Sequence, residues 1–294
     1  METAYLRACR LLPRHFREIA MALSQDKTKT AEEFRLRAGG DATVLLPDGE
    51  HSLLPGTAVT AGDLDSLLDI ATGASAYASR QSMKNGFLTA AGGCRIGLCG
   101  TAVIKGGAID GLRSLSSVCI RIPRQIDGCA DSIYPRLKQL GHPSTLIISP
   151  PGAGKTSLLR ELVRLCSDGG LRVSLADERG EVAAAVDGIP QFDVGRRTDV
   201  LTGAGKAEAV MLMLRAMNPE IIALDEITAP EDVRAIESAS NCGVRLLATA
   251  HGDGLSDLRE RGIYRQLLDK GIFGCCIIIQ KTLGLREYAL EMLK

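Results

Sequence analysis

The chain has 294 residues, of which 45% are hydrophobic and 24% charged, enough apolar material for one large domain or two modest cores. Its 35 basic and 35 acidic residues cancel, which argues against a sequence-independent nucleic-acid binder. Its apolar runs are shorter than the roughly 18 to 20 residues of a membrane-spanning helix, and arginines interrupt the apolar amino terminus. We therefore expect a cytoplasmic protein without a signal peptide or membrane span.

Cysteine and histidine spacing gives no sign of a metal site. The nine cysteines are scattered between Cys9 and Cys276, none forms a C-x-x-C pair, and the four histidines show no ligand spacing. We expect reduced, buried thiols and no structural zinc.

The first half of the chain is predicted to be a small α+β domain, residues 1–138. Apolar residues recur at helical spacing over about 3–23. Over residues 34–38 apolar residues alternate with arginines, as in a strand. Thr60 is a plausible N-cap for a further helix through Ile70. Three β-prone segments follow, separated by glycine-containing turns typical of hairpins: 87–91, 94–104 and 113–122.

The second half, residues 139–294, alternates short apolar strands with helices, which indicates an α/β domain with a mainly parallel sheet. The expected strands are 146–149, 173–176, 221–224, 244–249 and 272–279. The expected helices are 155–167, 205–217, 231–240 and 254–269. A closing hairpin is expected from 277–280 and 285–293.

The strongest motif joins an apolar strand to a helix through a turn of small residues. In a P-loop the backbone N–H groups face the phosphates of a nucleotide, Lys155 reaches the β- and γ-phosphates, and Thr156 binds Mg²⁺. The residues expected to cradle ATP are Ser149, Pro150, Pro151, Gly152, Ala153, Gly154, Lys155, Thr156 and Ser157. Ser149 replaces the first glycine of the usual pattern. A chance glycine turn is the alternative, which the flanking strand and helix disfavour.

Three polar clusters end other predicted strands. Asp225 would support Mg²⁺ and Glu226 would activate the attacking water, unless the two acids are merely a solvated strand end. Asp177 and Glu178 should reach the same sheet edge, although a charged, helix-capping turn would look alike. His251 could sense the γ-phosphate, or be a neutral histidine satisfied by local hydrogen bonds.

The order of these motifs resembles the secretion and pilus-retraction ATPases of type II and type IV systems. Within them the chain is most similar to the stage III sporulation AA family of endospore-forming bacteria. The resemblance rests on Phe34-Arg-Leu-Arg-Ala-Gly, Gly86-Phe-Leu-Thr, Cys94-Arg-Ile-Gly, Ser117-Val-Cys-Ile-Arg, the P-loop, Asp177-Glu-Arg-Gly-Glu, Leu214-Arg-Ala-Met-Asn-Pro-Glu, Asp225-Glu-Ile and Ala250-His-Gly.

This resemblance implies a RecA-like P-loop NTPase motor domain that hydrolyses ATP with Mg²⁺ and works as a homo-hexamer. It also implies a place at the cytosolic face of a membrane-embedded export complex, on the mother-cell side of the channel to the forespore. The cysteine-rich zinc module of many type II secretion ATPases is missing from the chain, which suits the sporulation branch.

The resemblance also draws attention to Arg95 and Arg121, which match arginines that reach the γ-phosphate from the small domain of the pilus-retraction relatives. They lie in a basic region, residues 80–138, which could simply be a solvated surface. Two rival functions stay open. A nucleotide-binding scaffold with little hydrolysis is favoured by Ser149. A nucleic-acid motor is favoured by the basic region but opposed by the low aromatic content, with no Trp, so no nucleic-acid partner is expected.

Overall fold

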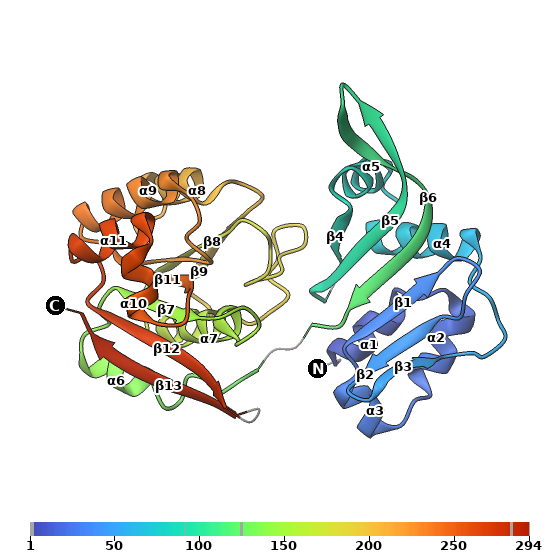
Figure 1. Ribbon diagram of the computed structural model, residues 1–294, viewed down its shortest axis with the longest axis horizontal. Coiled ribbons are helices and arrows are strands. Elements are labelled where there is room, and N and C mark those ends of the chain that lie inside the picture. The colour runs from blue at the N-terminus through green and yellow to red at the C-terminus, as the bar shows by residue number, and fades with distance from the viewer. Residues whose placement is uncertain (1–2, 91, 124–125, 283–284, 294) are drawn as a thin grey trace. The chain divides into compact units, whose positions relative to one another are not determined.

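The computed structural model of this chain describes residues 3–90, 92–123, 126–282 and 285–293. The chain folds into two units, Met1–Arg124 and Gln125–Lys294 (Figure 1). The sequence pattern suggested a boundary after residue 138. However, Ala130, Ile133 and Leu137 are buried in a core cluster of the second unit, so the segment before residue 138 belongs there.

The first unit is an antiparallel sheet of six strands in the order β3-β2-β1-β6-β5-β4. Its strands are β1 (Glu33–Arg37), β2 (Thr43–Leu46), β3 (Gly49–Ser52), β4 (Phe87–Ala90), β5 (Cys94–Lys105) and β6 (Ala108–Arg121). Its helices are α1 (Ala4–Arg10), α2 (Arg14–Met21), α3 (Gln25–Thr30), α4 (Ala61–Thr72) and α5 (Ala76–Asn85). The α+β class expected for this half is what the structure has.

Buried and exposed side chains alternate along the strands of this unit, and the buried ones form its core. Phe34 and Leu36 of β1 and Ile96 of β5 are fully buried in one cluster with residues of α1, α2 and α4. Thr60 caps α4 as expected, in a capping box with Asp63. The single helix expected over 3–23 is instead two helices, because Pro13, which has no N–H to donate, separates them.

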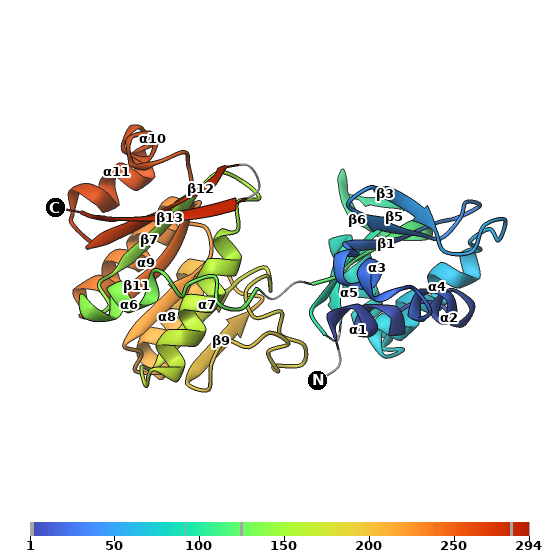
Figure 2. The same ribbon diagram turned by 90° about the horizontal axis from the view of Figure 1, so that it is seen from below.

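The second unit is a sheet of seven strands in the order β13-β12-β7-β11-β10-β8-β9. Figure 2 shows β13, β12 and β7 side by side at one edge of it. Its strands are β7 (Thr145–Ser149), β8 (Val173–Asp177), β9 (Thr198–Thr202), β10 (Ile221–Leu224), β11 (Arg245–His251), β12 (Cys275–Thr282) and β13 (Leu285–Met292). Its helices are α6 (Tyr134–Gln139), α7 (Lys155–Asp168), α8 (Lys206–Ala216), α9 (Pro230–Asn241), α10 (Leu255–Glu260) and α11 (Gly262–Asp269). Every strand pair is parallel except β12–β13, so the predicted α/β domain with a closing hairpin is confirmed.

Helices cover both faces of this sheet. One buried cluster joins α6 and α7 to the sheet, and the other joins α8, α9 and α11 to its opposite face. Side chains of consecutive β7 residues point to opposite faces of the sheet. Ile147 therefore belongs to the first cluster, and Leu146 and Ile148 belong to the second. Strand β9 escaped the sequence prediction, because its residues are only half buried and its pattern is weak.

The nine cysteines are free thiols. Five of them, Cys9, Cys94, Cys166, Cys275 and Cys276, are buried. Burial raises the pKa of Cys94, Cys166 and Cys276 to about 12, which suppresses their thiolate forms. No helix among the described residues is long and apolar enough to cross a membrane, and those residues contain no group of three or more His, Cys, Asp or Glu side chains placed to hold a metal ion.

Candidate active site

The strand order brings the polar clusters of the second unit to one edge. Strand β11 lies between β7 and β10, and β8 follows β10, all four parallel. Their carboxyl ends therefore lie side by side. The loop after β7, His251 at the end of β11, and the acids after β10 and β8 meet at this edge.

The loop between β7 and α7 adopts a conformation that needs glycine at two positions. Gly152 has φ of 73° and Gly154 has φ of 106°, values that suit glycine far better than other residues. Ser149 is fully buried and its φ is not positive, so serine causes no backbone strain where the usual pattern has glycine. Its hydroxyl donates a hydrogen bond to the Pro150 carbonyl at 3.0 Å.

Lys155 begins α7 and turns its ammonium back toward the loop. Its Nζ donates to the carbonyl oxygens of Ser149 at 3.2 Å and Pro150 at 3.4 Å, and lies 2.9 Å from Nδ1 of His251. Burial lowers the pKa of Lys155, while the carboxylates of Asp225 and Glu226 oppose that shift. The result is a buried cation at the start of the helix, placed to neutralise phosphate.

Asp225 follows β10 and is held between two hydroxyl groups. The Thr156 hydroxyl donates to its Oδ2 at 2.9 Å, and the Thr249 hydroxyl of β11 donates to its Oδ1 at 2.6 Å. Thr156 and Asp225 thus present oxygen atoms within hydrogen-bond distance of each other. Hydroxyl and carboxylate oxygens are ligands that Mg²⁺ accepts. This donor set fits the metal that the P-loop motif predicts.

Glu226 has an unusual backbone that aims its carboxylate at His251. Its φ is 47°, a left-handed conformation uncommon for a residue other than glycine, and its N–H donates to the Thr249 hydroxyl at 2.8 Å. Oε1 of Glu226 lies 3.2 Å from Nε2 of His251. Because the Lys155 ammonium can only donate to Nδ1, the ring proton of a neutral His251 is assigned to Nε2, facing Glu226.

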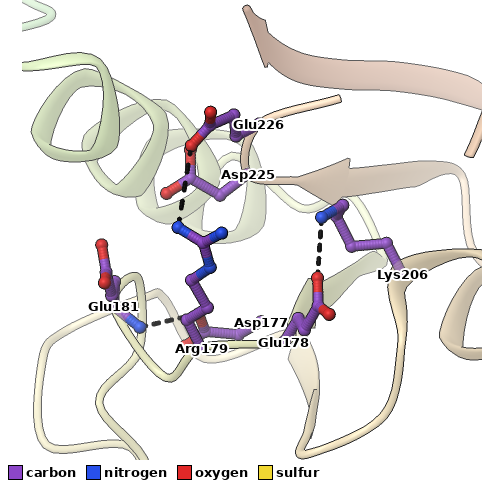
Figure 3. A pocket seen from close by; sticks show the side chains of 7 residues that line it. All are labelled: Asp177, Glu178, Arg179, Glu181, Lys206, Asp225 and Glu226. Atoms are coloured by element: carbon purple, nitrogen blue, oxygen red, sulfur yellow. Dashed lines mark hydrogen bonds and ion pairs between the residues drawn. The ribbon is translucent and has the colours of Figure 1, made fainter. Parts of the chain in front are cut away.

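The two acids at the end of β8, Asp177 and Glu178, have different roles (Figure 3). Asp177 is 1% exposed and accepts hydrogen bonds from the N–H groups of Glu181, Val182 and Ala183, so it holds the loop that follows β8. Burial raises its pKa, opposed by these three N–H groups. Both acids line the cavity at the sheet edge with Asp225 and Glu226, and the Glu178 carboxylate does so without holding the loop.

Two cations in this cavity were not anticipated from the sequence. The buried Lys206 at the start of α8 binds Glu178 with a 2.7 Å ion pair and lies 3.9 Å from Asp232. Arg179 is largely exposed and lies 4.0 Å from Glu226 (Figure 3). Nothing in the local sequence marks Lys206, because a lysine in the first turn of a helix is ordinarily solvated.

Arg95 and Arg121 belong to the first unit, where they are register partners on β5 and β6. Together with Arg35 they line a hollow of about 330 Å³ on the sheet. The Arg95 guanidinium lies 4.7 Å from the centre of the Phe87 ring, and Arg121 Nε lies 3.3 Å from a carboxylate oxygen of Glu33. Arg121 is 65% exposed, which leaves it accessible.

The second unit thus brings together five residues singled out in the sequence: Lys155, Thr156, Asp225, Glu226 and His251. A threonine on the intervening strand, Thr249, connects the two acids. The loop after β7, the acid beside Thr156 and the second carboxylate therefore lie together at one edge of the sheet.

Solved structures with the same fold are secretion and pilus ATPases, so the chain has the α/β fold of the P-loop NTPases of that class. The Legionella pneumophila ATPase DotB matches with a TM-score of 0.62 and 15% identity, over 98% of this chain and 80% of that one. The pilus retraction motor PilT with bound ADP matches with a TM-score of 0.64 and 16% identity, over 92% of this chain and 81% of that one.

The family follows from sequence comparison. The family described as "Sporulation stage III, protein AA" matches residues 6–285. The Stage III sporulation protein AA of Bacillus subtilis (strain 168) is 36% identical over 279 residues, which cover 93% of this chain and 90% of that protein. The chain belongs to this sporulation family, as the sequence motifs led us to expect.

Proposed function

We propose that this protein is a Mg²⁺-dependent ATPase whose site is the edge formed by β7, β11, β10 and β8. The observation that carries the proposal is the 2.9 Å hydrogen bond from Thr156 to Asp225 beside the Lys155 ammonium. It joins the phosphate-binding loop to the acidic strand end, as a metal-dependent nucleotide site requires. The fold shared with secretion and pilus ATPases supports the same class.

In the proposed reaction, Lys155 and the backbone N–H groups of the loop hold the β- and γ-phosphates. Thr156 and Asp225 hold Mg²⁺, which when bound would neutralise charge on the phosphate oxygens. Glu226 accepts a proton from water as the water oxygen bonds to the γ-phosphorus and the bond to the bridging oxygen of ADP breaks. The products are ADP and inorganic phosphate.

His251 positions Glu226 rather than reacting itself. With its proton on Nε2 it donates to one carboxylate oxygen, which leaves the other free to accept from water. Nδ1 of the same ring accepts a hydrogen bond from the Lys155 ammonium, so His251 links the phosphate-binding cation to the base. Glu178 lines the same cavity and is the second candidate for the base.

We extend the proposal to the assembly and its place in the cell. A homo-hexamer would set nucleotide between subunits, with Arg95 and Arg121 of one subunit reaching the γ-phosphate held by its neighbour. Family membership supports action during endospore formation, at the cytosolic face of a membrane-embedded channel complex. Such a motor would energise export or feeding through that channel, on the mother-cell side.

Two substitutions test the ATPase proposal. Lys155→Ala should abolish tight ATP binding and hydrolysis together, since charge on the β- and γ-phosphates is then uncompensated. Glu226→Gln should bind ATP but hydrolyse it about 10²-fold more slowly, because the amide cannot accept the proton. Phosphate release and ATP binding are measured beside Glu231→Gln, which alters an exposed glutamate of α9.

The outcomes separate the proposal from its rivals. Normal ATP binding by Lys155→Ala would mean that the loop is misassigned. Full turnover in Glu226→Gln would move the base to Glu178. Tight binding by the wild-type protein without phosphate release, at concentrations where it assembles, would favour the nucleotide-binding scaffold. Turnover stimulated by single-stranded DNA would favour the nucleic-acid motor.

A further inference from the structure

A second cation reaches the phosphate-binding loop from the far end of the chain. A methyl group added at the α-carbon of Gly154 would lie 3.1 Å from Nε and 3.3 Å from Cζ of Arg286. The Arg286 guanidinium therefore lies directly against the glycine that precedes Lys155. Arg286 is exposed, so its charge remains accessible to a ligand at the loop.

The closing hairpin explains how Arg286 arrives there. Tyr288 and Leu290 of β13 pack with Ile277 and Ile279 of β12 in the same buried cluster as α7. Alternation along the strand puts Arg286, two residues before Tyr288, on this same face. The apolar part of the face thus anchors the hairpin against α7, and Arg286 continues it at the start of that helix.

Neighbouring groups agree with this placement. The Cys129 thiol donates to the Ser157 carbonyl in the first turn of α7 at 3.7 Å. The positive charge of Arg286 acts to lower the pKa of this thiol, although burial raises it overall. Arg286 therefore lies beside the first turn of α7 as well as beside Gly154.

The two cations approach the loop from opposite sides of β7. Lys155 points toward His251 on β11, the neighbour of β7 on the side of the acids. Arg286 comes from β13, beyond β12 on the other side. A cation on that side lies away from Glu226, so a nucleotide held by the loop would present to it the diphosphate that ADP and ATP share. A guanidinium binds such a group through two N–H groups.

We propose that Arg286 is a nucleotide-binding residue, which contacts the diphosphate shared by ADP and ATP from within the same subunit. The inference rests on the proposed ATPase function and adds a residue to its binding site. Because Arg286 binds substrate and product alike, it contributes affinity without sensing the γ-phosphate. In this it differs from the role proposed for Arg95 and Arg121.

The test is calorimetric binding of Mg·ADP and of Mg·ATP, the latter in the Glu226→Gln background to prevent turnover. Arg286→Ala should raise both dissociation constants about tenfold, the size expected from losing a charge-assisted hydrogen bond. Arg286→Lys keeps the charge but not the planar fork, so its loss should be smaller. Glu287→Gln, at the next and equally exposed position of β13, is the matched control.

Each result has a distinct reading. Unchanged ADP affinity in Arg286→Ala would overturn the inference and leave Arg286 as a packing contact of Gly154. A loss confined to ATP would also overturn it, because the residue would then read the γ-phosphate. Tighter ADP binding would overturn it too, since the guanidinium would then compete with nucleotide. If the wild-type protein and Glu287→Gln fail to bind ADP as well, the ATPase proposal itself is wrong.

Discussion

Replacing Thr249 by valine tests how the two acids of the site are held. Thr249 is fully buried, donates to Asp225 at 2.6 Å and accepts from the Glu226 N–H at 2.8 Å. Valine has nearly the same shape but can make neither bond. Thr249→Val should therefore release the Asp225 carboxylate and the left-handed backbone of Glu226 while leaving the packing of β11 intact.

The cost can be worked from these two contacts. A hydrogen bond to a charged group contributes about 1.5 to 3 kcal/mol, and a buried N–H without a partner costs about 1 to 3 kcal/mol. The added methyl group of valine returns about 0.8 kcal/mol. The free energy of unfolding of the second unit should fall by about 3 kcal/mol. Thr249→Ser keeps the hydroxyl and loses one methyl, so it should cost only about 1 kcal/mol.

Urea titrations followed by circular dichroism measure the stability of both variants. Titration of ATP hydrolysis with Mg²⁺ measures the site, and Thr249→Val should need more Mg²⁺ and reach a lower rate than Thr249→Ser. If Thr249→Val is as stable and as active as Thr249→Ser, the hydroxyl does not hold the two acids, and the reasoning is refuted.

Three further predictions concern other parts of the molecule. Hydrogen bonds from Arg164 and from the Gly128 N–H lower the pKa of the Glu161 carboxyl, so its contribution to stability is present above about pH 4.5 and is lost as the pH falls below that value. In urea titrations at several pH values, Glu161→Gln should therefore reduce the loss of stability at acidic pH. An unchanged acid dependence would refute this assignment. Asp177→Ala leaves three backbone N–H groups without their acceptor, so it should lower the free energy of unfolding of the second unit by about 3 kcal/mol in the same titrations. A loss under about 1 kcal/mol would contradict the role of Asp177 in holding the loop. Mixing Arg121→Ala with Lys155→Ala, each inactive alone, should restore some ATPase activity if the arginine acts between subunits, and no recovery in confirmed mixed assemblies would exclude that.

The P-loop and the acidic strand ends were accessible from sequence because their chemistry depends on short local spacing. Lys155 and Thr156 come after the short loop that follows one strand, and Asp225 and Glu226 follow another, so parallel topology alone predicts their meeting. Arg286 could not be placed in this way. Its position depends on the register of the β12–β13 hairpin and on packing against α7, which no local pattern encodes.

Pairing between charged side chains was equally hard to foresee. Glu178 was expected at the nucleotide edge, and it does line that cavity, but its partner Lys206 comes from the start of a helix 28 residues later in the chain. The two halves of the predicted helix over 254–269 are also separated at Arg261, whose guanidinium holds Asp257 and the carbonyl of His251. Such breaks are set by tertiary contacts that a local helical pattern does not contain.

The buried thiols give each unit a native reporter of its own opening. Cys9 and Cys94 lie in the core of the first unit, and Cys166, Cys275 and Cys276 in the cores of the second. A thiol with a pKa near 12 reacts extremely slowly with alkylating reagents while it stays buried, so labelling follows exposure of the surrounding core. Mass spectrometry of briefly alkylated protein would therefore distinguish which half of the chain loosens first, without any engineered label.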